Sequence, residues 1–215
     1  MALNINGTTG ISGVDGSVSA PAVTGTDSNT GITFPSADTI KFSTGGVERM
    51  QITNSGVTGT GVGGKFASYA IICDQKATDA NGGSSSTGSF NTRDLNTELA
   101  DPDGIVSISS NQFTLQAGTY LIRASAPAYK GQEHQCLIWN ATDSSAVAIG
   151  TCEYSNTVGT TTRAFAIGRT TIGSAKVFDI RHRVGNGLAT HGLGVACNYD
   201  TLASVYTIVE IYKEA

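Results

Sequence analysis

Residues 113–129, FTLQAGTYLIRASAPAY, carry the clearest strand signal in the chain. A run of β-forming residues, an Ala-Gly turn and a longer alternating run follow one another without a break. Alternation with a period of two sends successive side chains to opposite faces of a sheet. The segment therefore predicts two successive strands, and on its own it favours a β-sandwich.

Short strand-like segments separated by turn signals recur through the second part of the chain. One turn is expected at Asp101-Pro102-Asp103-Gly104, since proline presets φ and glycine accepts positive φ. Further segments with strand character are residues 68–74, 89–98, 105–109, 133–139, 146–154, 161–171, 176–184, 193–199 and 204–213. Such regular spacing predicts an all-β sandwich or barrel, and no segment has a convincing helical period.

The composition argues against several classes of function. The net charge is −4 and the basic residues form no stripe, so nucleic acid is not an expected partner. No apolar run approaches about 18 residues, so insertion into a membrane is not expected. The first ten residues, MALNINGTTG, have neither a basic region nor an apolar core, and we expect no secretory signal there.

Residues 1–64 differ in character from the rest of the chain. Gly7, Gly10, Gly13 and Gly16 recur at every third position, which is the spacing of a collagen triplet. The run is only four triplets long and has no proline, so a glycine-rich extended arm or tight turns are the better interpretation. We therefore expect an N-terminal arm and stem over residues 1–64 and a head over residues 65–215.

A β-hairpin is predicted within this N-terminal part. Ile40 and Phe42 alternate with polar neighbours, a Gly-Gly pair interrupts the run, and Met50 and Ile52 alternate again. Residues 57–64, VTGTGVGG, have the composition of a flexible joint to the head. A single hairpin is marginal in water, and this part is too poor in apolar residues to bury its own core. It therefore needs identical chains or a larger assembly around it.

The N-terminal part also resembles the stem repeats of tailed-phage fibre proteins. The phrase NTGITFPSADTIKFSTGGVERMQITNSG, residues 29–56, recurs along the shaft of such fibres, often after a stretch like GTTGISGVDGS, residues 7–17. Here the phrase occurs once, which implies a short stem in place of a long shaft. The resemblance implies that residues 1–56 attach the protein to other virion proteins.

The head resembles the complement globular-head and tumour necrosis factor superfamily. Residues 113–129 look like the family's core strand pair, with Gly118 and Tyr120 in the places of its Gly-x-Tyr pattern. SVYTIVEIYK, residues 204–213, is similar to the family's last strand, which closes the sheet next to the first strand. The resemblance implies a ten-strand jelly roll that assembles as a tight homotrimer.

Two further stretches look like the phage variants of this head. They are VFDIRHRVGNG, residues 177–187, and GLGVACNYD, residues 192–200. In those variants a strand with His-Arg precedes a glycine-rich turn and a strand of small residues. Phage members of the family usually form the tip of a fibre, so the resemblance implies a location in the virion.

A metal site is not predicted. His134, His182 and His191 are the only histidines, and their spacing matches no metal-binding motif. On a strand, the side chain of His182 faces away from those of the two flanking arginines. We expect these histidines in the head or at a subunit contact.

The cysteines form no zinc motif either. They are widely spaced, without a CxxC pair, and we expect them to be free thiols packed as small hydrophobic side chains. Disulfides would need an oxidising compartment that nothing in the sequence indicates. The four residues are Cys73, Cys136, Cys152 and Cys197.

No feature of the sequence predicts an enzyme or a cofactor. The chain has no GxSxG motif and no suggested Cys-His pair. Asp101 and Asp103 would serve a glycosidase or a calcium site only if other groups met them, and turn chemistry already explains both residues. The third alternative is an enzyme that acts on host polysaccharide. It would need a convergent pair of carboxylates, and the sequence shows no such pair.

The best candidates for binding are loop aromatics with polar neighbours. Trp139 ends a predicted strand beside a polar turn, Tyr129 precedes Lys130, and Tyr199 precedes Asp200. Aromatic faces stack on sugars, and nearby amides and carboxylates bind hydroxyl groups. The alternative is that these rings cap the core or line a subunit contact.

These observations lead to one expected architecture with two alternative functions. We expect an all-β chain with an N-terminal extended arm, a β-hairpin stem and a ten-strand jelly-roll head that forms a homotrimer. The first hypothesis is a short phage tail fibre, made in the bacterial cytoplasm, whose head binds a glycan or protein on the host surface. The alternative is a capsid decoration or cement protein with the same trimeric knob, anchored by its N-terminal arm.

Overall fold

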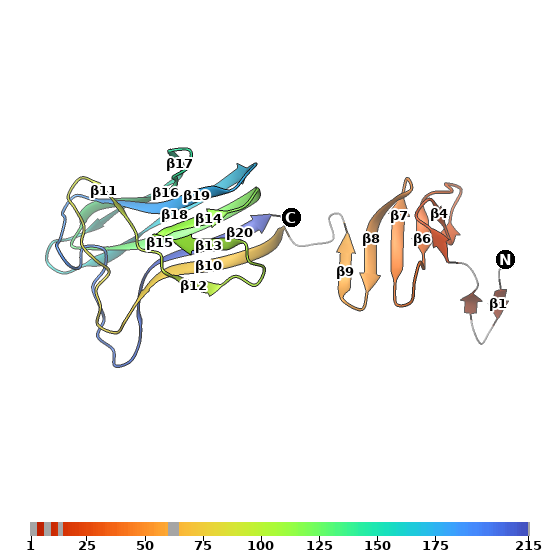
Figure 1. Cartoon of the computed structure of the whole chain (residues 1–215), viewed down its shortest axis with the longest axis horizontal. Helices are drawn as coiled ribbons and strands as arrows, with labels where there is room; N and C mark the ends of the chain where they lie inside the picture. The colour runs from red at the N-terminus through yellow and green to blue at the C-terminus, as the bar shows by residue number, and fades with distance from the viewer. Residues whose placement is uncertain (1–3, 7–9, 13–14, 60–64, 215) are drawn as a thin grey trace. The chain divides into compact units, whose positions relative to one another are not determined.

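The computed structural model describes residues 4–6, 10–12, 15–59 and 65–214. The chain divides into two compact units, Met1–Lys65 and Phe66–Ala215 (Figure 1). We call the first unit the stem and the second unit the head. Every regular element within the described ranges is a β-strand, and these ranges contain no helix that could cross a membrane.

The stem contains three small antiparallel sheets. Its strands are β1 (Asn4–Asn6), β2 (Gly10–Ser12), β3 (Gly16–Ser17), β4 (Ala20–Pro21), β5 (Val23–Thr24), β6 (Gly31–Thr33), β7 (Ile40–Thr44), β8 (Val47–Thr53) and β9 (Gly56–Gly59). β1 pairs with β2, β3 pairs with β4, and the last five strands form a meander in the order β5-β6-β7-β8-β9.

The predicted hairpin is confirmed. Gly45 and Gly46 connect β7 to β8 with φ values of 60° and 73°, which favour glycine. The joint expected over residues 57–64 is wrong in its first part, because Val57 pairs with Ile52 and extends the sheet as β9. Residues 60–64 lie outside the described ranges, as do Gly7 and Gly13 of the glycine triplets. The strands β1 and β2, which lie before and after Gly7 in the chain, pair antiparallel.

The five-stranded stem sheet has one apolar face. Ile32 pairs with Phe42 and Phe42 with Met50, so these three side chains form a row across β6, β7 and β8. Ile40 and Ile52 form a second row that continues to the exposed Val57. All of these side chains except that of Val57 are only half-buried. The face therefore keeps much of its apolar surface in contact with water.

The head is built from eleven described strands. They are β10 (Phe66–Lys76), β11 (Phe90–Thr92), β12 (Thr97–Ala100), β13 (Val106–Ser109), β14 (Gln112–Leu115), β15 (Gly118–Tyr129), β16 (Gln132–Asn140), β17 (Ser145–Ser155), β18 (Thr161–Ile172), β19 (Lys176–Val184) and β20 (Ser204–Glu214). One sheet has the order β12-β10-β20-β15-β18 and the other has the order β13-β14-β19-β16-β17. The short β11 pairs with β19 beside this path.

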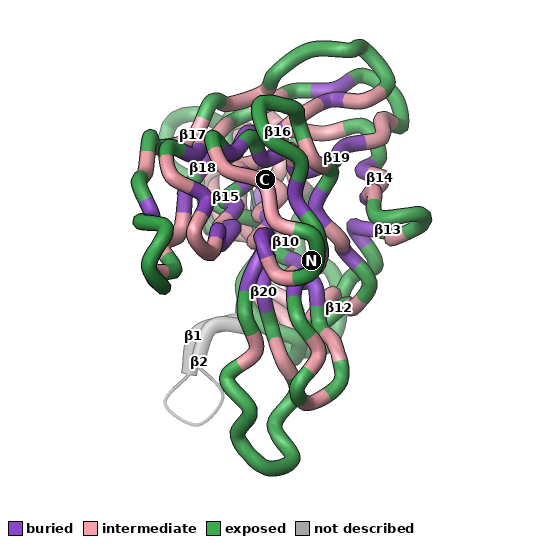
Figure 2. Tube along the Cα trace, turned by 90° about the vertical axis from the view of Figure 1, so that its left-hand side faces the viewer, coloured by how far each residue is buried: buried purple, intermediate pink, exposed green. Residues whose placement is uncertain are grey.

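This strand order is a jelly-roll sandwich, as predicted. Ten strands form two five-stranded layers, and the last strand, β20, lies between the first strand of the head, β10, and β15. Consecutive strands often lie in opposite layers, which is the mark of this fold. Figure 2 shows the buried positions along the strands and the exposed positions in the loops that project from them.

The segment with the strongest strand signal crosses between the two layers. β14 pairs with β13 and β19, whereas β15 pairs with β18 and β20. The two predicted strands are therefore present, but they do not pair with each other. The Tyr120 hydroxyl donates a hydrogen bond to the carbonyl of Gln116 at 3.0 Å, and the Tyr120 side chain is fully buried. This hydrogen bond lies at the crossing.

The core lies between the two layers. Ile72, Ile122 and Ile211 point inward from the first sheet, and all three are fully buried. Phe113 and Phe178 from the second sheet stack with ring centroids 5.5 Å apart. Each fully buried side chain of this size contributes about 1.5–3 kcal/mol of transfer free energy. The predicted alternation therefore reflects a sandwich interior.

Two predicted strands are wrong. Residues 193–199 form no strand, because Leu193 is buried beside Arg93 and its carbonyl accepts a side-chain hydrogen bond from Arg93, not a bond of a sheet ladder. The predicted strand over residues 89–98 divides into β11 and β12, which belong to different sheets. The chain crosses between them at Arg93, whose side chain enters the core.

Candidate functional site

The head has two distinct ends. Phe66 pairs with Glu214 at one end, which we call the base. Tyr129 pairs with Thr161 at the opposite end, which we call the tip. Figure 1 shows the C-terminus and the start of β10 at the base, and long loops at the tip. Loops held by a rigid sandwich are common places for recognition.

The structure does not gather the three predicted aromatic residues into one site. Tyr129 and Tyr199 both lie toward the tip, where Tyr129 ends β15 and Tyr199 is 67% exposed in the loop before β20. Trp139 lies toward the base on β16, where the Arg181 guanidinium stacks 4.3 Å from its ring centre. The spacing of residues along the sequence does not show at which end of the sandwich a given loop or strand end will lie.

The ring of Tyr129 packs against neighbouring side chains, as expected of a structural residue. Its ring is half-buried, the His191 ring lies 5.2 Å away, and Lys130 Nζ lies 5.2 Å from the ring centre. Tyr199 is more accessible and lines a small pocket of about 230 Å³ with Val195 and Leu202. Of the three predicted residues, Tyr199 is the one that presents an open aromatic surface.

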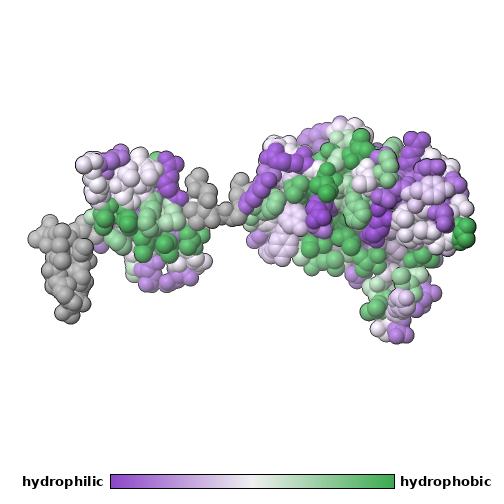
Figure 3. Space-filling model, turned by 180° about the vertical axis from the view of Figure 1, so that it is seen from behind, coloured by the Kyte–Doolittle hydropathy of each residue, from purple (hydrophilic) through white to green (hydrophobic). Residues whose placement is uncertain are grey.

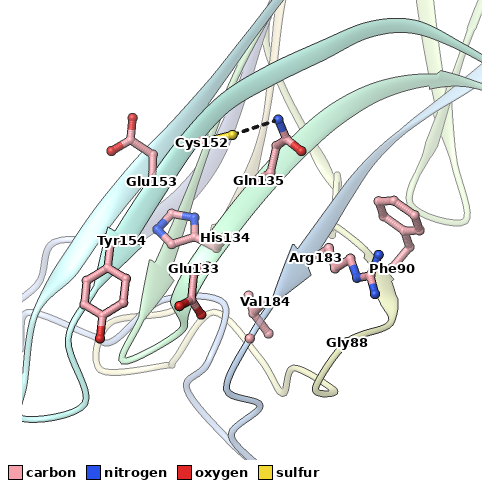
Figure 4. Close-up of a pocket in the computed structure, with 11 residues that line it drawn as sticks. Gly88, Phe90, Glu133, His134, Gln135, Cys152, Glu153, Tyr154, Arg183 and Val184 are labelled. Carbon is pink, nitrogen blue, oxygen red and sulfur yellow. Dashed lines mark hydrogen bonds between the residues drawn. The ribbon is translucent and has the colours of Figure 1, made fainter.

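A larger groove lies at the tip on the outer face of the sheet that contains β16, β17 and β19. We call it the tip groove, and its volume is about 710 Å³ (Figure 4). Its first row of side chains crosses four strands, since Gln135 pairs with Cys152 on one side and with Arg183 on the other, and Arg183 pairs with Phe90. The Gln135 amide also contacts Cys152 Sγ at 3.3 Å.

A second row of the tip groove lies one step closer to the tip. It contains Tyr154 and Glu133, which are paired neighbours, and the two glycines Gly185 and Gly88. Gly185 N donates to the carbonyl of Glu133 at 2.8 Å, and Gly88 N donates to the carbonyl of Val184 at 2.9 Å. Because the glycines carry no side chain, the floor is low between Glu133 and Arg183.

A side chain at Gly185 would displace the neighbouring carboxylate. A Cβ at this position would lie 2.6 Å from Glu133 Oε2. Figure 4 shows Glu133 and Tyr154 on one side of the groove and Arg183 and Phe90 on the other. The rings of Phe90 and Tyr154 are 53% and 56% exposed, which is unusual for side chains of this size in a folded head.

A buried polar network lies on the inner side of the same strands. His134 Nδ1 lies 2.9 Å from His182 Nε2, and His134 Nε2 lies 2.7 Å from Thr162 Oγ1. Burial lowers the pKa of His134 and holds the pKa of His182 well below its usual range, with the positive charge of Arg93 acting in the same direction. The His182 Nδ1 atom is buried and has no hydrogen-bond partner within the described ranges.

Arg93 is a fully buried cation in this network. Its guanidinium donates to Thr207 Oγ1, to the carbonyl of Pro127 and to the carbonyl of Leu193, at distances of 2.7, 3.1 and 2.7 Å. Burial lowers the pKa of Arg93 to about 10, and the nearby carboxylate of Asp74 opposes this effect. Through Arg93 the network joins β15, β20 and the loop that contains Leu193.

All three histidines lie in the head, as expected. His134 and His182 lie inside the head and meet across β16 and β19, although no sequence motif joins them. His191 lies apart, against Tyr129. Among the described residues, no group of three histidine, cysteine or acidic side chains is placed to hold a metal ion.

All four cysteines are free thiols, as expected, but only two of them pack as small hydrophobic side chains. Cys73 and Cys136 are fully buried, and burial raises the pKa of both thiols, that of Cys136 to about 11. Cys152 and Cys197 are exposed, so the idea that they pack as small hydrophobic residues is wrong for them. Cys152 lies in the tip groove because the outward face of β17 is open there.

The two carboxylates of the Pro-Gly turn are engaged locally. Asp101 accepts hydrogen bonds from the amides of Ile105 and Val106 at 2.8 and 3.0 Å. Asp103 accepts a hydrogen bond from the hydroxyl of Ser68. Asp101 therefore organises the turn before β13, as turn chemistry predicts, whereas Asp103 connects this turn to Ser68 of β10.

The outer face of the other sheet carries exposed apolar side chains. Phe165 and Ile167 of β18 alternate with the buried Ala164 and Ala166, so they point outward, and they are 49% and 58% exposed. Tyr69 of β10 is also exposed on this sheet, at 44%. Figure 3 shows hydrophobic residues gathered in a band across the head. The ion pair between Arg123 and Glu210, at 3.0 Å, lies among these residues.

Comparisons with known proteins give distant likenesses only. The chain matches no protein-family profile and no curated protein sequence. Among solved structures, murine APRIL at pH 5.0 has 6% identity and a TM-score of 0.44, and the match covers 68% of this chain and 98% of that chain. The globular domain of the zebrafish complement 1qA protein has 12% identity and a TM-score of 0.41, with 67% and 95% covered.

The vertex protein P5 of PRD1 is a third similar structure. It has 11% identity and a TM-score of 0.45, and the match covers 71% of this chain and 100% of that chain. Identities and TM-scores this low say nothing about activity or partners.

The tip groove could not be found from the sequence. Its residues come from four separate segments around Phe90, Gln135, Cys152 and Arg183. They meet only through the cross-strand register of β11, β19, β16 and β17. The single local sign of the groove in the sequence was Gly185, the glycine that follows β19, and a glycine there also fits an ordinary turn.

Proposed function

We propose that the protein is a non-enzymatic virion protein that forms homotrimers and binds the surface of the host cell through the tip of its head. The observation that carries this proposal is the contrast between the two outer faces of the head. One face exposes Phe165 and Ile167, which suits burial against identical subunits. The opposite face carries the tip groove, which stays free when the apolar face is covered.

The stem supports self-association independently. Its sheet is a single layer whose apolar face carries Ile32, Phe42, Met50 and Ile52, all half-buried in the isolated chain. A single layer of this kind is not stable by burial alone, since its apolar side chains need a second surface. Identical stems packed around an axis supply that surface, and closed symmetry is the usual form of soluble oligomers.

The virion location rests on the stem phrase, residues 29–56, which resembles the repeats of phage fibres. In this proposal residues 1–56 attach the trimer to other virion proteins. The head, which follows the stem in the chain, carries the recognition surface at its tip. Tyr199 and the tip groove are the parts of the tip with exposed aromatic rings.

Two measurements test the proposal. Light scattering of the purified chain should give three times the chain mass of 22.1 kDa, and a monomeric mass at micromolar concentration would exclude the trimer. The purified protein should also compete with virus particles that carry it for adsorption to the cells they infect. Absence of both cell binding and competition, with a correct trimer, would exclude the role in host attachment.

The short stem favours a second candidate function, which is decoration of the capsid by the same trimer. A single copy of the fibre-like phrase spaces the head only a small distance from its anchor, and this suits a protein that covers a shell. Immunogold labelling of intact virus particles separates the two functions. Many labels over the capsid indicate decoration, whereas a few labels at the tail indicate a fibre.

A further inference from the structure

We propose that the tip groove binds a neutral, hydroxyl-rich oligosaccharide, with Phe90 and Tyr154 as stacking rings and Glu133 and Arg183 as the groups that bind hydroxyls. This inference deepens the proposed function, on which it rests, by assigning the recognition site and the chemistry of its ligand. None of these four residues was predicted from the sequence.

The groove is shaped for a ring lying flat on the sheet. Gly185 and Gly88 leave the floor between Glu133 and Arg183 without side chains. The rings of Tyr154 and Phe90 stand on either side (Figure 4). The side chains that form it come from paired positions on β11, β19, β16 and β17, all within one sheet. A site built on strands holds its geometry better than one built on loops.

The charged groups that face the groove are not used elsewhere. Within the described ranges, neither the Glu133 carboxylate nor the Arg183 guanidinium has an ion pair or a side-chain hydrogen bond to the protein. The Arg183 guanidinium lies 5.9 Å from the centre of the Phe90 ring, which orients it along the groove wall. One side therefore offers acceptors and the other offers planar donors.

The balance of charge selects a neutral ligand. The Glu133 carboxylate and the Arg183 guanidinium face the groove, so an anionic sugar would meet Glu133. A cationic ligand would meet Arg183. Neighbouring hydroxyls of a neutral pyranose donate to the carboxylate and accept from the guanidinium, so both charged groups become bonded without a net charge in the ligand.

The two aromatic rings supply the contact with the apolar side of the sugar. Phe90 and Tyr154 are more than half exposed, so their faces are open to a ligand without rearrangement of the core. The C–H face of a pyranose is apolar and packs on such rings, while the ring edge carries the hydroxyls. The spacing of the rings on opposite sides of the low floor suits an extended oligosaccharide.

The groove is also separate from the face that we assign to self-association. Phe165 and Ile167 lie on the sheet of β15, β18 and β20, and the groove lies on the other sheet. Covering the apolar face with a second chain therefore leaves the groove in contact with solvent. A trimer would carry three copies of the groove.

The test uses the full chain and a defined set of probes. The neutral probes are maltoheptaose, N-acetylchitotetraose and lacto-N-neotetraose, the anionic probe is an oligomer of sialic acid, and the cationic probe is a chitosan tetramer. Binding is measured by saturation-transfer NMR and by titration calorimetry. We expect saturable binding of at least one neutral probe and weaker binding of both charged probes.

Three variants connect this binding to the groove. Phe90→Ala and Arg183→Gln should each weaken binding of the neutral probe by about ten-fold or more. Gly185→Ala should weaken it as well, because its Cβ displaces the Glu133 carboxylate. Phe66→Ala is the matched control, since it removes an exposed ring at the base of the head, and it should leave the dissociation constant unchanged. Tyr199→Ala separates the groove from the other exposed ring at the tip.

The results that overturn the inference are distinct from failure of the proposed function. No saturable binding of any neutral probe, tighter binding of a charged probe, or binding that depends on Tyr199 and not on Phe90 would each overturn it. If the protein binds host cells equally well with and without Phe90→Ala, host attachment stands and the groove assignment falls. Cell binding that needs Phe90 but survives periodate oxidation of surface sugars would indicate a protein receptor and overturn it too.

Discussion

His134 and His182 share a hydrogen bond inside the head, with His134 Nδ1 2.9 Å from His182 Nε2. One of the two nitrogens donates its proton in the hydrogen bond and the other accepts it. The bond therefore requires that at least one of the two imidazoles is neutral. The burial of both rings and the buried cation Arg93 oppose protonation of either imidazole, and so lower the pKa of both histidines. Glu153 acts in the opposite direction on His134 alone.

We predict that the head loses stability as the pH falls below about 6.5, the ordinary pKa of histidine. Both imidazoles have a lower pKa in the folded chain than in the unfolded chain, so below that value the unfolded chain binds protons that the folded chain does not. The free energy of unfolding should be constant from pH 8 to 7 and then fall by up to about 1.4 kcal/mol per pH unit for each histidine.

Urea unfolding between pH 8 and 5.5 measures this dependence. Carboxylates with ordinary pKa values stay ionised over this range, and Asp74, whose pKa burial raises, would act in the opposite direction. His191→Gln is the control, because it removes the histidine outside the pair and should keep the slope. A wild-type profile that is flat between pH 7 and 5.5 would contradict the prediction.

Arg93 provides a second prediction. Arg93→Met keeps much of the side-chain volume but removes the donors to Thr207, Pro127 and Leu193, leaving buried acceptors without partners. Each such loss costs on the order of 1–3 kcal/mol, so the variant should lose about 3 kcal/mol or more. Denaturant unfolding of the head transition measures the loss.

Lys176→Met is the matched cation-to-methionine control for this experiment. It removes a surface ion pair with Asp143, at 2.6 Å, in which Asp143 is about half exposed. Pairs of this kind contribute no more than about 1 kcal/mol. If the two variants unfold at similar denaturant concentrations, Arg93 is not the structural centre that its burial suggests.

Much of the sandwich was predictable because its signal is local. Apolar and polar residues alternate along β15 and β20 because one face of each strand is buried. This alternation predicts the ends of both strands to within two residues. The Ala-Gly turn between β14 and β15 is also predictable, but the sequence pattern does not show that the chain changes layer there. The resemblance to jelly-roll families gave the strand order that periodicity could not.

The site was much less predictable for a related reason. Phe90 was placed in a longer strand that does not exist, and Gln135 and Arg183 have no sequence relation to each other. The loop of residues 193–199 was read as a strand, since the burial of Leu193 mimics one position of an alternating pattern. Contacts set by cross-strand register become visible only when the strands are in place.

The apolar outer face of the head leads to a third prediction. Ile167→Glu places a carboxylate in the middle of the surface that we assign to the trimer, where association would remove it from water. Dissociation of the trimer should become at least about a hundred-fold easier, which corresponds to about 2.8 kcal/mol. Light scattering across a dilution series measures this change as a shift from the trimeric to the monomeric mass.

A control with equal added charge keeps this experiment specific. Val158→Glu adds the same group in the loop between β17 and β18, where the side chain is 86% exposed, and should leave the mass unchanged. Unchanged circular dichroism of both variants would show that the head is still folded. A trimer that survives Ile167→Glu at nanomolar concentration would place the subunit contact elsewhere.

The last prediction concerns the crossing that joins the two layers. Tyr120→Phe keeps the buried ring but removes the hydrogen bond from its hydroxyl to the carbonyl of Gln116, at 3.0 Å. The carbonyl loses a partner in the turn, so the head should lose about 0.5–1.5 kcal/mol of stability. Tyr199→Phe, at an exposed ring, should change stability by less than about 0.5 kcal/mol. Thermal unfolding of both variants measures the difference, and equal midpoints would show that packing of the Tyr120 ring, without its hydroxyl, holds β14 and β15 in opposite sheets.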